Sequence, residues 1–154
     1  MANVIIKKAA KEDLQQILEL QYLAFQSEAV RHDDFSIQPL KQTLAEIEQE
    51  YRKGLFLKAI DESDKIVGSV RAYAENGTAY IGKLIIQPKM QSQGIGTKLM
   101  KAIEQEYIGM RYELATGYKS TRAIGIYEHL GYIRFKEQKI SDKLTFVFLE
   151  KCSV

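Results

Sequence analysis

One short segment, in which two glycines stand between an apolar run and an amphipathic run, constrains this chain more than any other. Residues 87–99 read Gln-Pro-Lys-Met-Gln-Ser-Gln-Gly-Ile-Gly-Thr-Lys-Leu, after a predicted strand and at the start of a predicted helix. Gly94 and Gly96 let the backbone approach a ligand closely. The helix start adds unpaired N–H groups and the positive end of the helix dipole. The segment therefore predicts a strand–turn–helix unit that binds an anion, with a phosphate-bearing cofactor as its natural ligand.

The spacing of these glycines indicates which of the known phosphate-binding loops this segment can form. A P-loop requires Lys and then Ser or Thr after its last glycine, but Thr-Lys follows Gly96 here. The dinucleotide fingerprint requires a third small residue three positions after Gly96, where this chain has Leu99. A protein that binds ATP through this loop is therefore a disfavoured alternative. The pattern that remains is Gln91-x-x-Gly94-x-Gly96 directly after a strand.

Length and charge narrow the class of protein. The 154 residues are 45% apolar, which suits a single domain over residues 1–154. Lys and Arg exceed Asp and Glu by only 2, with both signs mixed along the chain, so we expect no nucleic-acid partner. The start of the chain lacks a secretory signal, and no apolar run approaches the roughly 18 residues of a membrane span. These features predict a soluble cytoplasmic protein with no membrane partner.

The hydrophobic pattern predicts seven strands and four helices. We expect strands at residues 4–8, 55–60, 65–74, 78–87, 112–116, 132–139 and 144–150, and helices at 14–24, 39–53, 95–108 and 120–129. Asn76-Gly77 predicts a tight hairpin, Pro39 is expected to open the second helix, and Ser120 is expected to cap the fourth. Residues 27–38 suit an irregular connection or a short extra turn. This order predicts an α+β protein with three α/β/α layers around a mixed, mostly antiparallel sheet.

A second segment adds to the functional signal of the glycine loop. Residues 120–132 read Ser120-Thr-Arg-Ala-Ile-Gly-Ile-Tyr127-Glu-His-Leu-Gly-Tyr. The two segments resemble the motifs Gln/Arg-x-x-Gly-x-Gly/Ala and Asn-x-x-Ala-x-x-x-Tyr-Glu-x-x-Gly-Phe/Tyr of the GCN5-related N-acetyltransferase (GNAT) family, with Ser120 in place of the frequent Asn. The resemblance implies the acyl-CoA N-acyltransferase fold. It also implies an enzyme that transfers an acetyl group from acetyl-CoA directly to a primary amine of a small molecule or peptide.

The resemblance also implies which residues bind and react. It assigns the pantetheine arm to the backbone of Leu84, Ile85 and Ile86, and a proton donor for the departing sulfur to Tyr127. It assigns a further contact with the pantetheine arm to Ser120. The pyrophosphate is assigned to the loop that contains Gln91, Ser92, Gln93, Gly94, Ile95, Gly96 and Thr97. Without the flanking motif, Tyr127 would be interpreted as a core residue.

Several questions stay open at the level of sequence. No carboxylate stands out as the general base, and the candidates, besides a chain of water molecules, are Glu28, Asp33, Asp34, Glu75 and Glu113. The acceptor is equally open between a small amine, a polyamine, an aminoglycoside and a peptide amino group, and residues 27–38 and 138–143 are expected to wall its site.

The remaining histidines and basic residues give no clear sign of a metal site or of a catalytic role. His32 and His129 stand apart, without nearby ligands, so we expect no metal site. The basic side chains are interpreted mostly as solvated charges, with Lys98 and Arg122 the candidates for a contact with the cofactor's 3'-phosphate; they are Lys83, Lys89, Lys98, Lys119 and Arg122. A non-catalytic acyl-CoA-binding or regulatory module is the alternative function, and a homodimer is compatible with the resemblance.

Overall fold

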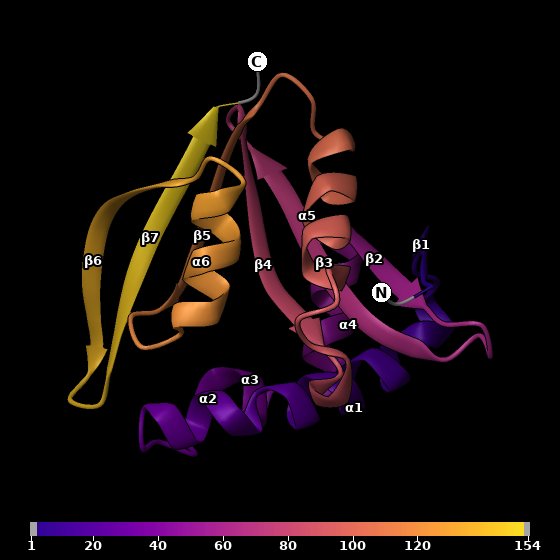
Figure 1. The fold of residues 1–154 in the computed structure, drawn as a ribbon, viewed down its shortest axis with the longest axis horizontal. Helices are drawn as coiled ribbons and strands as arrows, with labels where there is room; N and C mark the ends of the chain where they lie inside the picture. Colours follow the sequence, from indigo (N-terminus) through magenta and orange to yellow (C-terminus); the bar gives the residue numbers. More distant parts are fainter. Residues whose placement is uncertain (1–2, 153–154) are drawn as a thin grey trace.

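The computed structural model describes residues 3–152, which form a seven-stranded sheet between two layers of helices (Figure 1). The strand order is β1-β2-β3-β4-β5-β7-β6, and each neighbouring pair is antiparallel except β4–β5, which is parallel. This confirms the expected mixed, mostly antiparallel sheet. The strands are β1 (Ile5–Lys8), β2 (Leu55–Ile60), β3 (Ile66–Glu75), β4 (Thr78–Ile86), β5 (Arg111–Gly117), β6 (Ile133–Ser141) and β7 (Leu144–Cys152).

Six α-helices and two short 3-10 turns accompany the sheet within residues 3–152. The helices are α1 (Leu14–Ala24), α2 (Gln26–Arg31), α3 (Gln38–Lys41), α4 (Leu44–Lys53), α5 (Ile95–Gln105) and α6 (Thr121–His129), and the turns are η1 (Lys11–Asp13) and η2 (Pro88–Met90). In Figure 1, α5 and α6 lie in front of the sheet and α4 lies behind it. None of the helices in the described part is long and apolar enough to cross a membrane.

Two hydrophobic clusters, one on each face of the sheet, hold these layers together. Leu99 of α5 packs with Val70 and Leu114 in one cluster, while Ile17 of α1 packs with Phe56 and other residues in the second. Each fully buried aliphatic side chain contributes roughly 1.5–3 kcal/mol. Because side chains alternate along a strand, β4 takes part in both clusters: Leu84 and Ile86 pack on the α5 side, and Ile85 packs on the α1 side.

The structure corrects two expectations about where helices begin. The predicted second helix is divided, because Thr43 starts α4 with a capping box: Thr43 Oγ1 accepts from the Glu46 N–H at 3.2 Å, and Glu46 Oε1 accepts from the Thr43 N–H at 2.9 Å. Pro39 therefore opens only the single turn of α3. Ser120 precedes α6, but its side chain makes no capping hydrogen bond. The other short helix, α2, lies largely within residues 27–38, where an irregular connection or a short extra turn was expected.

Local turn chemistry fixes the hairpin that leads into β4. Asn76 and Gly77 both have positive φ, at 51° and 82°, as a two-residue hairpin of the predicted kind requires. β4 then pairs with β5 over only three residues, Thr78 to Tyr80. Beyond Tyr80 the two strands separate toward the end of the molecule where α1, α2 and α3 lie (Figure 1).

A β-bulge in β4 lies at this point of separation. Ser69 of β3 pairs with Ile85 and Arg71 pairs with Gly82, so that two residues of β4 oppose one residue of β3. Lys83 lies in this bulge and has a φ of +46°. The bulge bends β4 where it leaves β5.

Candidate functional site

A cavity of about 940 Å³ lies in the opening between β4 and β5. Its walls come from the second half of β4, the end of β5, the loop before α5, the first part of α6, residues 24–39 and the β6–β7 hairpin. A volume of this size suits a cofactor or substrate of small-molecule dimensions. The cavity brings together the two sequence segments that carry the predicted chemistry.

The glycine loop forms one end of this cavity. Gly94 has a φ of +81° and starts α5, and the first hydrogen bond of the helix joins the Lys98 N–H to the Gly94 carbonyl at 3.1 Å. The N–H groups of residues 95–97 therefore have no acceptor within the helix, as an anion site requires. The predicted loop residues that line the cavity are Gln91, Ser92, Gly94, Ile95, Gly96 and Thr97. Gln93 lies in the same loop but does not line the cavity.

The unpaired edge of β4 forms the long wall. Leu84, Ile85 and Ile86 all line the cavity, and they lie beyond the last residue of β4 that pairs with β5. The edge of β4 that faces β5 is therefore open at these residues. Backbone groups on such an edge can pair with an extended ligand as with an added strand.

Tyr127 lines the cavity from α6. The residue is only 6% exposed, and its ring lies 6.0 Å from that of Tyr132 within the hydrophobic cluster. No group among residues 3–152 forms a hydrogen bond with its hydroxyl. Burial, and then the negative charge of Glu28, raise the pKa of the Tyr127 phenol above its ordinary range. The phenol is thus protonated at neutral pH and can act as a hydrogen-bond or proton donor.

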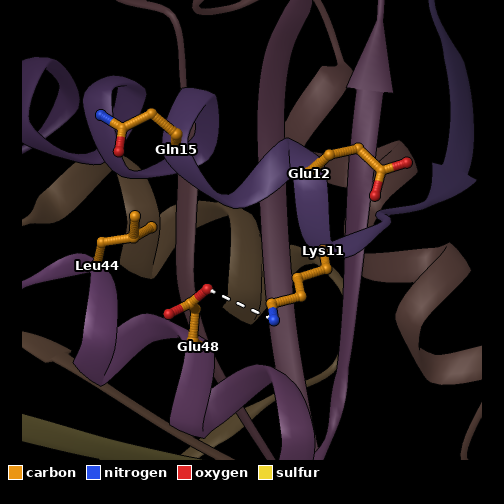
Figure 2. A pocket seen from close by; sticks show the side chains of 5 residues that line it. All are labelled: Lys11, Glu12, Gln15, Leu44 and Glu48. Carbon is orange, nitrogen blue, oxygen red and sulfur yellow. Dashed lines mark ion pairs between the residues drawn. The ribbon is translucent and has the colours of Figure 1, made fainter.

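A second, shallower depression of about 330 Å³ lies between η1, α1 and α4 (Figure 2). Figure 2 shows the side chains of Lys11 and Glu48 pointing toward each other across it, with an ion pair of 4.0 Å. The other lining residues are Glu12, Gln15 and Leu44. The cavity between β4 and β5 instead combines a helix start, an open strand edge and a phenol hydroxyl, so we assign the candidate site to it.

Comparison with known proteins agrees with this geometry. A family model described as an acetyltransferase (GNAT) domain matches residues 14–152. The chain belongs to the GNAT family. A search of curated proteins finds no significant match.

Solved structures share the fold of this GNAT domain at low sequence identity. The ribosomal-protein-S18-alanine N-acetyltransferase of Escherichia coli has a TM-score of 0.80 and 14% identity, over 99% of this chain and 96% of that one. A phosphinothricin acetyltransferase of Sinorhizobium meliloti, solved with acetyl-CoA, has a TM-score of 0.77 and 16% identity over 97% and 88%. The PaiA N-acetyltransferase of Thermoplasma acidophilum, solved with coenzyme A, gives 0.77 and 16% over 97% and 99%.

Ser120 lies behind the cavity wall of this GNAT domain. It is almost fully buried, and its hydroxyl donates a short hydrogen bond to Oε2 of Glu28. Oε1 of the same carboxylate accepts from Arg31 Nη1 at 2.6 Å. Glu28 itself lines the cavity, with its side chain 21% exposed. The two hydrogen bonds hold this carboxylate in place beside α6.

The structure distinguishes the five carboxylates among which the sequence left the choice open. Only Glu28 and Asp34 of these five line the cavity. Glu113 lies at the paired start of β5 and accepts from Arg111 Nη1 at 2.8 Å, and Asp33 pairs with Lys143 at 3.9 Å. Glu75 ends β3 beside the hairpin, at the far end of β4 from the opening. Both are half-buried, but Glu28 is the member of this pair whose negative charge acts on the Tyr127 phenol.

The structure separates the basic residues that the sequence left together. Lys83, interpreted as a solvated charge, lines the cavity with its side chain only 19% exposed, so that interpretation is wrong. Arg122 also lines the cavity, and its Nη1 donates to Ser92 Oγ at 2.6 Å, which joins α6 to the glycine loop. Lys98 is exposed and does not line the cavity. No local sequence signal marks Lys83, because its burial depends on the bulge and on packing against α4.

Proposed function

We propose that this GNAT domain is an acetyl-CoA-dependent N-acetyltransferase that moves the acetyl group directly to a primary amine. One observation carries the proposal: a glycine-bearing helix start and an open strand edge line the same cavity as Tyr127, whose hydroxyl has no hydrogen-bond partner within residues 3–152. An elongated thioester with a pyrophosphate at one end matches this order of groups. The acetyl-CoA and coenzyme A complexes of the similar structures support the same choice of donor.

Each part of the cavity then has a task. The N–H groups of Ile95, Gly96 and Thr97 hold the pyrophosphate. The edge of β4 at residues 84–86 pairs with the pantetheine arm, and one of its N–H groups polarises the thioester carbonyl. A backbone donor aimed at developing negative charge is worth about 3 kcal/mol. Tyr127 gives its proton to the sulfur as the C–S bond breaks.

Glu28 is the group we propose to accept a proton from the amine. An amine that arrives as an ammonium ion must lose two protons to become an amide nitrogen. The first passes to the Glu28 carboxylate, which then releases it to solvent. The second replaces the proton that Tyr127 gave to the sulfur, so that the charges balance over one turnover. Arg31 is 38% exposed and can turn away from Glu28 when an ammonium ion approaches.

The test is release of coenzyme A from acetyl-CoA in the presence of a panel of amines. Wild-type protein should acetylate at least one amine, and Tyr127→Phe should lower kcat by about a hundredfold in saturating acetyl-CoA. Its dissociation constant for acetyl-CoA should be unchanged. Tyr132→Phe is the matched control, because the Tyr132 hydroxyl donates to Glu104 at 2.8 Å in a contact outside the cavity.

An unchanged kcat in Tyr127→Phe would overturn the role of Tyr127. Tight binding of acetyl-CoA without acetylation of any amine would instead indicate the non-catalytic acyl-CoA-binding module.

A further inference from the structure

We propose that the amine accepted by this GNAT domain also carries an anionic group, a carboxylate or a phosphate, and that Lys83 binds that group. The inference rests on the proposed function and names the substrate class of the same site. It arises from a half-buried cluster formed by Arg71, Glu50 and Lys83, in which cations outnumber carboxylates. Among residues 3–152, Lys83 is the only member of this cluster on the cavity wall.

The backbone at Lys83 is in a conformation that lysine rarely adopts. Its φ of +46° lies in the left-handed region, which costs a residue other than glycine about 1–2 kcal/mol. The β-bulge that imposes this conformation lies on the cavity wall. A strained residue persists where the surrounding structure determines it, and bulges often re-aim a side chain beside a functional site. Here the bulge places Lys83 on the cavity wall, with its ammonium group 3.6 Å from Oε1 of Glu50 in α4.

In this cluster the Glu50 carboxylate forms ion pairs with two cations, Arg71 and Lys83. Glu50 Oε2 accepts from Arg71 Nη1 at 2.9 Å, and Glu50 Oε1 lies 3.6 Å from Lys83 Nζ. Glu50 is the only carboxylate within ion-pair distance of either cation in the described part of the chain. The remaining contacts of the cluster are neutral, such as Gln42 Nε2 to Glu50 at 2.7 Å and Arg71 Nη2 to Gln21 at 2.5 Å. Within ion-pair distance, the three ionised groups therefore leave one positive charge in excess, and the charge of Glu46 acts on Lys83 only from farther away.

This excess charge is partly enclosed, because the side chains of Lys83 and Glu50 are 19% and 36% exposed. The Arg71 side chain is 7% exposed, and its Nε has no hydrogen-bond partner within residues 3–152. Burial lowers the pKa of both Arg71 and Lys83, and the charge of Arg71 lowers that of Lys83 further. An uncompensated charge away from water is costly, and an anion beside it removes part of that cost. Lys83 is the cation through which a ligand in the cavity can supply the anion.

The position of Lys83 points to the acceptor rather than to the donor. Lys83 extends toward α4, on the face where Ile85 packs with α1, whereas Leu84 and Ile86 pack with the opposite cluster, which includes α5. The glycine loop starts α5, so a pyrophosphate there lies on the other side of β4. Residues 24–39, which line the cavity from the α1–α3 segment, include Glu28 as a site for the ammonium group. We therefore assign the ammonium group of the ligand to Glu28 and its anionic group to Lys83, an assignment that a polyamine does not satisfy.

The experiment compares amines that differ only in charge. Each series contains an amino acid, its carboxamide and the corresponding aminophosphonate, and CoA release gives kcat/KM for each. We expect at least one acid to exceed its amide by at least about tenfold. Whichever acid is preferred identifies the anion. Lys83→Met should remove this preference through a rise in KM for the acid, with KM for acetyl-CoA and for the amide unchanged.

Two further variants separate the role of Lys83 from folding and from overall charge. Lys83→Gly removes the charge and relieves the positive φ, so it should fold stably and lose the same preference. Lys89→Met makes the same change of charge on the exposed turn η2 and should keep the preference. A loss of equal size in Lys89→Met would overturn the inference.

Failure of the inference and of the proposed function give different results. If amides are acetylated as well as acids, the inference is wrong and the N-acetyltransferase function stands. If no amine of any charge is acetylated while acetyl-CoA binds, the proposed function is wrong. The inference about the acceptor, which rests on that function, is then wrong as well.

Discussion

At the scale of single residues, Tyr127 belongs to the core and to the candidate site at once. Its ring packs within the cluster that also holds Ile95 and Leu99, and its hydroxyl has no partner in the described chain. The two interpretations of Tyr127 from the sequence, as a core residue and as a proton donor, are therefore compatible. A ring fixed by packing keeps its hydroxyl in one place, which is what a positioned proton donor requires.

Glu28→Gln tests the proposed proton acceptor. The amide keeps the size of the side chain but cannot take up the proton, so we expect kcat/KM at neutral pH to fall by about a hundredfold with acetyl-CoA binding unchanged. Ser120→Ala removes the hydroxyl that holds the carboxylate and should cost much less, because the base itself remains. Asp34→Asn, which changes the other half-buried carboxylate on the cavity wall, is the matched control. Equal losses in Glu28→Gln and Asp34→Asn would contradict the assignment.

Gly117→Ala tests how α2 is seated against the end of β5. A Cβ at Gly117 would lie 2.5 Å from both Cε1 and Nε2 of His32, whose imidazole is buried. The imidazole must shift, so we expect the free energy of unfolding to fall by about 1–3 kcal/mol in urea titrations. Gly125→Ala is the control, because its Cβ would meet nothing within 4 Å on α6. That helical substitution should raise stability by roughly 0.5–1 kcal/mol, and equal stability of Gly117→Ala and wild type would refute the contact.

At the scale of elements, those with local signals are predictable and those set by cross-strand register are not. The Asn76-Gly77 hairpin and the Gly94 start of α5 follow from backbone preference alone, and both are as expected. The Thr43-x-x-Glu46 capping box is also a local signal, and it could have located α4.

The bulge at Lys83 depends instead on how β3 and β4 pair, which no local sequence pattern records. The contact of Ser120 with Glu28 is of the same kind, since it joins residues 92 positions apart. The sequence therefore indicated that the glycine loop, the β4 edge and Tyr127 lie together, as they do around the cavity, but not that Lys83 and Glu28 also line it.

Asp13 joins the η1 turn to β2 and predicts a pH-dependent part of the stability. Its Oδ2 accepts from Lys58 Nζ at 2.8 Å and from the Ala10 N–H at 2.7 Å. Burial tends to raise the pKa of this carboxyl, but the hydrogen bonds and the charge of Lys58 outweigh it and hold the pKa below 3.8. A carboxyl with a lowered folded-state pKa contributes stability above its unfolded pKa, and this contribution is lost as the pH falls through the folded value.

Asp13→Asn should therefore be less stable than wild type by about 1 kcal/mol at neutral pH. The difference should shrink below about pH 4, where the wild-type carboxyl becomes protonated. Urea unfolding of both proteins from about pH 3 to pH 7 measures this. A difference that stays constant over that range would show that the charge of Asp13 contributes nothing.

At the scale of the whole molecule, the sheet consists of two parts that meet over a short seam. Only three residues of β4 pair with β5, and beyond them the cavity separates β1–β4 from β5–β7. Side chains that bridge the opening include Arg122 with Ser92, and Ser120 with Glu28. A ligand in the cavity would touch both parts of the sheet. Its binding free energy would therefore add to the stability that the short β4–β5 pairing supplies.

Coenzyme A should therefore stabilise the two parts together. A ligand that binds only the folded state at a hundred times its dissociation constant adds about 2.7 kcal/mol to the free energy of unfolding. Hydrogen exchange should slow in β5 at residues 114–117 as well as in β4 at residues 81–86, because the bound chain lies between both strands. Adenosine, which has neither the pyrophosphate nor the pantetheine arm, is the control and should protect neither strand. Protection by coenzyme A confined to residues 91–97 would mean that the ligand binds the glycine loop without entering the opening, and Tyr127 would then lie too far from it to meet the sulfur.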